Sequence, residues 1–170
     1  MYIALTGTPG TGKTCAAKIL AKRGHSIITV EELAAQHGAI ESVGGEKEVD
    51  TEKLLAAVSE PAEPVIVVGH LAHYVPNTLC IILRCHPETI RKRLSSRNYP
   101  KEKVMENMEA EAIDLILAEA LEAWENVFEV DTTVLSPENV ADAIERIMNG
   151  DTVEYSPGKI DWSGAVMDWY

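Results

Sequence analysis

The sequence predicts an α/β fold in three layers, with a doubly wound parallel five-stranded sheet between helices. Short apolar runs of strand length recur along the chain, and most of them are separated by helical patterns. A glycine-rich loop joins the first apolar run to the first helical pattern. The length of 170 residues fits one domain, and no internal repeat is visible.

The expected strands are short apolar runs, because the strands of a parallel sheet are buried on both faces. The first is Tyr2–Thr6, which stops at Gly7. The others are expected at residues 26–30, 64–68, 78–84 and 127–130.

Apolar spacing and capping residues predict the helices between these strands. Asp50 or Thr51 is suited to cap one helix, and Pro87 fits the first turn of another, where its missing N–H costs nothing. Ser136 precedes a further helix, whereas residues 39–50 show no clear pattern. The helices are expected at residues 13–23, 31–36, 51–58, 87–96, 101–126 and from 136 onward. Residues 151–170 are expected to form a C-terminal tail packed on the body.

Composition and cysteine content favour a cytoplasmic globular protein. Hydrophobic residues make up 46% of the chain and charged residues 25%, which is ordinary for a folded domain. The three cysteines are odd in number and lack CxxC spacing, so they indicate a reducing compartment. No apolar stretch is long enough for a membrane span, and the chain enters its glycine-rich loop within seven residues, which predicts no signal peptide.

The net charge is 15 − 27 = −12, which argues against nonspecific binding to nucleic acid. The charge is unevenly distributed. Residues 84–103 hold seven basic and two acidic residues, a balance of +5, whereas residues 104–170 hold two basic and 16 acidic residues, a balance of −14. A basic segment therefore lies within an acidic protein.

The segment Gly7–Thr14 (GTPGTGKT) matches the phosphate-loop pattern GxxxxGK[ST]. Glycines at these positions let backbone N–H groups turn toward phosphate oxygens, while the following helix directs its positive end at them. Lys13 is then expected to meet the β- and γ-phosphates of ATP, and the hydroxyl of Thr14 to hold Mg²⁺. The segment lies between a predicted strand and a predicted helix, so we expect it to bind a nucleotide.

Other motifs narrow the class of phosphate-loop protein. A GTPase should carry NKxD and DxxG, but the nearest strings, residues 158–161 and 161–164, overlap in the wrong order. The loop also resembles that of AAA+ ATPases, although 170 residues leave little space for their helical lid domain. This class stays open as an alternative.

The basic segment favours a small kinase. Arg84 ends a predicted strand, where ligands of open α/β sheets bind, and Arg93 and Arg97 are spaced to share one helix face. We expect the three guanidinium groups to converge on phosphates, because phosphoryl transfer requires positioning and charge neutralisation. The alternative is a solvated basic surface. His70 and His73 have the spacing of metal ligands, but no third ligand lies nearby in sequence.

Several segments, in this order and spacing, resemble the adenylate kinase isoenzyme-six family, including its archaeal members. These segments are residues 7–14, 67–70 (VVGH), 84–99 with its RxxxRxY ending, 102–111, and 158–162 (GKIDW) in the tail. The resemblance implies a P-loop nucleoside monophosphate kinase fold. It also implies a nucleotide-monophosphate segment at about residues 30–53 and a short lid at about residues 96–106.

The resemblance implies a role for each matching residue. Lys13, His70, Arg93 and Arg97 would be catalytic, and ATP would be held by Gly10, Gly12, Lys13, Thr14, Cys15 and Arg97. His70 would be the histidine of the family's Asp-x-His motif. Three positions depart from the family pattern: Val68 replaces the acid of that motif, Ala35 replaces an arginine for the monophosphate, and Asn98 replaces a lid glycine.

The resemblance implies the reaction ATP + AMP = 2 ADP, with Mg²⁺ and with additional ATPase activity. Members of the family are implicated in maturation of the small ribosomal subunit and its 16S-type rRNA. There they transiently bind a basic ribosomal protein of the S-eleven family, a partner that the acidic residues 104–170 would suit. The alternatives are a nucleotide-gated assembly ATPase with little or no kinase activity, or another small P-loop kinase.

Overall fold

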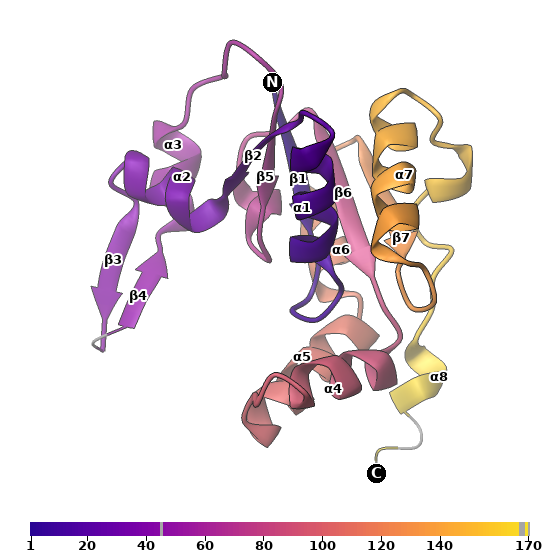
Figure 1. The fold of residues 1–170 in the computed structure, drawn as a ribbon. Helices are drawn as coiled ribbons and strands as arrows, with labels where there is room; N and C mark the ends of the chain where they lie inside the picture. Colours follow the sequence, from indigo (N-terminus) through magenta and orange to yellow (C-terminus); the bar gives the residue numbers. More distant parts are fainter. Residues whose placement is uncertain (45, 167–168, 170) are drawn as a thin grey trace.

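A five-stranded parallel sheet forms the centre of the computed structural model, which describes residues 1–44, 46–166 and 169. The strands lie in the order β2-β5-β1-β6-β7 (Figure 1). Each strand lies within one residue of its predicted range, and all neighbouring strands are parallel. The predicted doubly wound sheet is therefore confirmed. The strands are β1 Tyr2–Thr6, β2 Ser26–Thr29, β5 Val65–Val68, β6 Leu79–Arg84 and β7 Val127–Asp131.

Successive residues of β1 face opposite layers of helices, because side chains alternate along a strand. Ile3 and Leu5 lie in an apolar cluster with residues of α1 and α7, whereas Ala4 lies in a cluster on the other face. The first layer contains α1 Lys13–Lys22 and α7 Pro137–Met148. The second contains α2 Val30–Gln36, α3 Thr51–Ala57, the 3-10 helix η1 Ala72–Tyr74 and α6 Leu115–Ala123.

A third apolar cluster joins two helices beyond the carboxyl ends of the strands. Figure 1 shows these helices, α4 and α5, below the sheet and beside the C-terminal tail. Trp169 packs against this cluster, while Tyr155 packs on the α1–α7 side of the sheet. The tail thus contacts the body at both places, and Tyr170 lies outside the described residues. The elements are α4 Pro87–Ser95, α5 Lys101–Ala112, η2 Val153–Tyr155 and α8 Ser163–Val166. None of the described helices has the length and apolar character that a membrane span requires.

Two segments differ from what the sequence indicates. Residues 39–50, which show no clear pattern, form an antiparallel hairpin of β3 (Ile40–Val43) and β4 (Glu46–Val49). The prediction of one helix over residues 101–126 is wrong, because the chain breaks between α5 and α6. At the break Asp114 has φ 56°, a left-handed conformation that aspartate adopts more readily than most residues. The apolar spacing continues across the break, so periodicity alone does not reveal it.

The expectation that Arg84 meets phosphates is also wrong, because its side chain points into the body and is 1% exposed. Its Nε donates to Glu111 at 2.7 Å, its Nη1 donates to Glu129 at 2.5 Å, and its Nη2 donates to Asp114. Burial disfavours the charge of Arg84, but the carboxylates of Glu111 and Asp114 outweigh this effect and raise its pKa. The network joins β6, β7 and the α5–α6 break.

Arg84→Ala would leave Glu111 and Glu129 buried without their counter-charge. We expect the free energy of unfolding to fall by about 3–5 kcal/mol. Urea unfolding followed by circular dichroism measures this change. The control is Arg91→Ala, which removes an exposed ion pair with Glu88 and should cost less than about 1 kcal/mol. Equal losses in the two variants would contradict the assigned role of the network.

Candidate active site

The phosphate loop Gly7–Thr14 leaves the centre of the sheet at the carboxyl end of β1 and leads into α1. Gly12 is the N-cap of α1 with φ 101°, and no described side chain caps the helix. The positive end of α1 is thus available to an anion. Gly7 passes so close to β6 that a Cβ would lie 2.4 Å from the carbonyl oxygen of Leu83. The path of the loop therefore requires glycine at this position.

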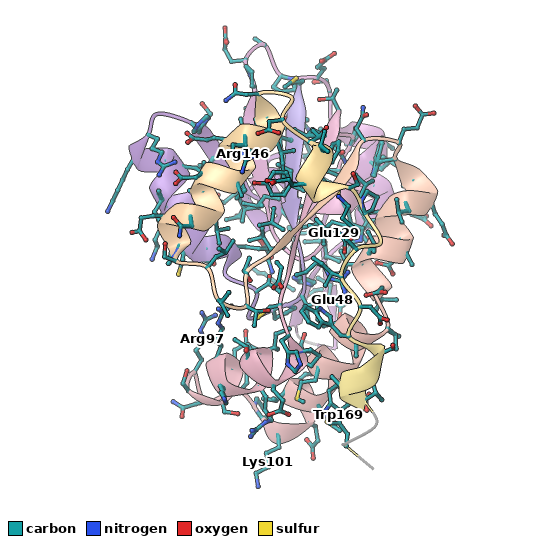
Figure 2. All side chains as sticks on the ribbon, turned by 90° about the vertical axis from the view of Figure 1, so that its right-hand side faces the viewer. Glu48, Arg97, Lys101, Glu129, Arg146 and Trp169 are labelled. Atoms are coloured by element: carbon teal, nitrogen blue, oxygen red, sulfur yellow. The ribbon has the colours of Figure 1, made fainter. Side chains whose placement is uncertain are left out.

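A cavity of about 260 Å³ opens over the loop. The structure brings most of the predicted site residues together on its walls. Those residues are Gly10, Gly12, Lys13, Thr14, Cys15, His70 and Arg97. Arg97 extends from the α4–α5 layer toward the sheet in Figure 2. The walls also include Thr29 and Glu31 from the end of β2 and the start of α2, which the sequence predictions missed.

Lys13 lies against the loop that precedes it. Its Nζ donates to the carbonyl oxygens of Gly7 at 2.5 Å and Thr8 at 3.0 Å. Burial lowers its pKa to about 8, although the carboxylate of Glu111 acts in the opposite direction. The ammonium group of Lys13 has thus lost part of its hydration before a ligand binds. The oxygens of a bound phosphate would stabilise its charge.

Two hydrogen bonds hold the loop against the body. The buried hydroxyl of Thr8 donates to Glu111 Oε2 at 2.6 Å, so the Arg84 network reaches the phosphate loop directly. On the other side, the hydroxyl of Thr132 donates to the carbonyl oxygen of Thr11 at 2.7 Å. The loop is thus fixed to α5 and to the segment that follows β7.

Arg93 and Arg97 line one cavity, as their spacing predicts, although α4 ends at Ser95 and Arg97 lies in the turn that follows. The Nη1 of Arg93 donates to the carbonyl oxygen of Gly10 at 3.1 Å, and its Nη2 donates to that of Thr132 at 3.1 Å. Arg93 therefore braces the loop. It also lines a second cavity of about 210 Å³.

This second cavity adjoins the first, since Gly12, Cys15 and Arg97 line both. Its remaining walls include apolar side chains from the segment after β7 and from α7, namely Leu135, Pro137 and Val140. The two cavities place a charged compartment and a more apolar compartment on either side of Arg97. Such a pair of compartments suits a ligand with phosphates at one end and an aromatic base at the other.

His70 lines the first cavity, and burial and the charge of Lys13 lower its pKa. It is therefore mainly neutral near pH 7, able to donate or accept a hydrogen bond. His73 is buried elsewhere, where its Nδ1 meets Thr6 Oγ1 at 3.1 Å and its Nε2 meets Glu119 at 3.0 Å. The two histidines therefore do not form a metal-binding pair.

Magnesium held with a nucleotide needs few protein ligands, because phosphates and waters supply most of its oxygen atoms. In the part of the chain that the structure describes, no three His, Cys, Asp or Glu side chains group as a metal site. The first cavity nonetheless offers the hydroxyl of Thr14 and the carboxylate of Glu31. This donor set fits Mg²⁺ bound together with ATP and does not fit a structural transition-metal site.

Solved structures define the class of fold. Shikimate kinase from Acinetobacter baumannii, in complex with shikimate, matches with a TM-score of 0.59 and 18% identity over 89% of this chain and 94% of that chain. Deoxyadenosine kinase from M. mycoides with bound dATP matches with a TM-score of 0.54 and 18% identity over 88% and 100%. The chain therefore has the fold of the P-loop kinases.

Sequence comparisons define the family. A family model described as an AAA domain matches residues 3–114, and the chain belongs to that family of phosphate-loop domains. Over nearly its full length the chain matches archaeal proteins named "Putative adenylate kinase". The one from Archaeoglobus fulgidus is 46% identical over 99% of this chain and 95% of its own length. The one from Thermococcus onnurineus is 45% identical over 96% and 92%. The chain belongs to this archaeal family of kinase-like enzymes, as the resemblance predicts.

We expect the affinity for ATP to fall as the pH rises above about 8. The pKa of Lys13 is lowered to about 8, so above this pH the free protein loses the proton that the phosphates attract. At one pH unit above the pKa only about a tenth of the lysine is charged. Calorimetric titration from about pH 7 to about pH 9.5 measures the profile.

The control is Lys13→Arg. Its guanidinium group keeps its charge over this range, so the affinity of this variant should not change with pH. A flat profile in the unmodified chain would contradict the assignment.

Proposed function

We propose that this protein transfers the γ-phosphoryl group of ATP to a nucleoside monophosphate, with AMP as the first candidate, and also hydrolyses ATP slowly. The observation that carries the proposal is the phosphate loop at the carboxyl end of β1, open to two adjoining cavities that share Arg97. The names of the archaeal relatives support AMP as the acceptor. A cytoplasmic location, which three unpaired cysteines favour, belongs to the same proposal.

The chain's own residues would perform the binding steps. The loop amides, Lys13 and the guanidinium group of Arg97 would hold the phosphates and stabilise the charge that develops during transfer. Magnesium, bound through the hydroxyl of Thr14, would neutralise part of the charge on the β- and γ-phosphates. Arg93 acts differently, because it holds Gly10 and Thr132 in place and so fixes the loop.

The adenine ring of ATP would occupy the second cavity. Leu135, Pro137 and Val140 offer apolar contacts there, and the planar guanidinium of Arg97 could stack on the base. The lid at about residues 96–106 would then move with Arg97 and exclude water from the phosphates. The monophosphate would approach from the side of Glu31 and His70, within the proposed segment at about residues 30–53.

A second candidate function is a nucleotide-gated assembly factor for the small ribosomal subunit. Two observations favour it: Ala35 cannot grip a monophosphate as an arginine would, and residues 104–170 carry a balance of −14. An acidic surface attracts a basic ribosomal protein and repels bare RNA. One ATP site would serve both functions.

A coupled assay that measures ADP formation from ATP and a panel of monophosphates tests the first function. We expect stimulation by AMP, and loss of at least about 100-fold in turnover for Lys13→Ala, because the charge opposite the transferred group is removed. Lys18→Ala is the matched control, since Lys18 is exposed on the same helix. If no monophosphate stimulates ADP formation, the kinase proposal is wrong.

A binding experiment tests the second function. The protein, immobilised, is mixed with purified small-subunit ribosomal proteins with ATP, with ADP and without nucleotide. We expect retention of a basic protein that changes with the nucleotide and weakens as salt increases. Retention that is the same in all three conditions would rule out nucleotide gating.

A further inference from the structure

The first cavity contains a carboxylate that the sequence analysis did not single out. Across the sheet Thr29 of β2 lies in register with Val68 of β5, the position where the family pattern has an acid. Glu31 follows Thr29 by two residues, near the start of α2, and both residues line the cavity with Thr14. Figure 1 shows α2 beginning where β2 ends, at the β2 edge of the sheet. A carboxylate is thus present next to the position that lacks one.

The side chain of Glu31 is available for a ligand, whereas that of its neighbour is not. Glu32 completes the capping box of α2: its carboxylate accepts from the N–H of Thr29 at 2.9 Å. Among the described residues, the side chain of Glu31 has no hydrogen-bond or ion-pair partner. Glu31 lines the same cavity as Lys13 and Thr14 of the phosphate loop and as His70 after β5. Its carboxylate therefore belongs to the wall of the cavity that would receive the phosphates.

A free carboxylate beside a phosphate site is costly unless a cation separates the two, because like charges repel. Magnesium prefers oxygen ligands and usually binds through one or two carboxylates together with substrate phosphates and waters. Of the described residues that line the cavity, Glu31 alone carries a carboxylate, and Thr14 contributes a hydroxyl from the phosphate loop. The remaining acid of the loop region, Glu111, is buried and already bonded to Thr8 and Arg84.

We propose that Glu31 is the positioning residue for the magnesium ion of MgATP and takes over the role of the acid that Val68 replaces. The inference rests on the proposed function and names the metal-orienting group of that site. It explains how a chain that lacks the acid of the Asp-x-His motif can still use magnesium. Glu31 acts on the phosphates through the ion and its bound waters.

The test compares the affinity for a non-hydrolysable ATP analogue with magnesium and with a chelator, by calorimetry. We expect magnesium to strengthen binding by the unmodified chain, and Glu31→Gln to reduce this gain by about tenfold, the loss typical of groups that orient a metal. Metal-free binding should stay the same or improve, because a repulsive charge is removed. Glu52→Gln is the matched control, because it removes an acid from the first turn of α3, outside the cavity. An unchanged gain in Glu31→Gln, or an equal loss in Glu52→Gln, would overturn the inference.

A second variant tests whether the two positions serve the same ion. Glu31→Gln combined with Val68→Asp moves the carboxylate back to the position that the family pattern predicts, and should recover most of the lost gain. If the double variant unfolds cooperatively but does not recover the gain in affinity from magnesium, Glu31 does not take over the role of the acid missing at position 68. If the unmodified chain bound the analogue in neither condition, the proposed function would fail and this inference with it. If magnesium strengthens binding equally in the unmodified chain and in Glu31→Gln, the inference about Glu31 fails and the proposed function does not.

Discussion

The buried guanidinium group of Arg84 is the interaction on which the geometry of the site depends. A buried charge that loses its partner strongly destabilises a fold, because the charge is left uncompensated. Here Glu111, Glu129 and Asp114 come from α5, β7 and the break before α6, so one ion fixes three elements beyond β6. Glu111 also accepts from the hydroxyl of Thr8 in the phosphate loop and from Trp162 Nε1 in the tail. Loop, helix layer and tail are thereby held in one arrangement, and Figure 2 shows Glu129 in the body above the α4–α5 layer.

The sheet could be predicted from the sequence because its signals are local. Strand length, burial on both faces and the phosphate-loop pattern all lie within runs of a few residues, and all five strands follow from them. Arg84 could not be placed in this way. Its partners lie 27, 30 and 45 residues further along the chain, and a strand-end arginine looks the same in sequence whether it meets phosphate or carboxylate. The break at Asp114 could not be predicted for the same reason. Asp114 has a left-handed backbone and pairs with Arg84 of β6, which is distant in sequence.

Some residues of the candidate site could be predicted from the sequence, and others could not. Lys13 and Thr14 line the cavity, as the phosphate-loop pattern indicates, and Cys15 and His70 line it with them, as the family resemblance implies. Glu31 and the apolar wall of Leu135, Pro137 and Val140 belong to no motif. Their only signal is topological: parallel strands end at one edge, so the residues just after β2 and β7 adjoin the loop after β1. The position of a residue just after a parallel strand is therefore a signal for the site even where no motif is present.

The phosphate loop is held on both sides by hydrogen bonds and opens to two adjoining cavities that share Arg97. We propose that this site passes a phosphoryl group to a nucleotide acceptor. This proposal is tested most directly by incubating the protein with AMP and with ATP labelled with ³²P at the γ position, then separating the products. We expect the label to appear in newly formed ADP. Label found only as inorganic phosphate, at a rate that AMP does not change, would contradict it.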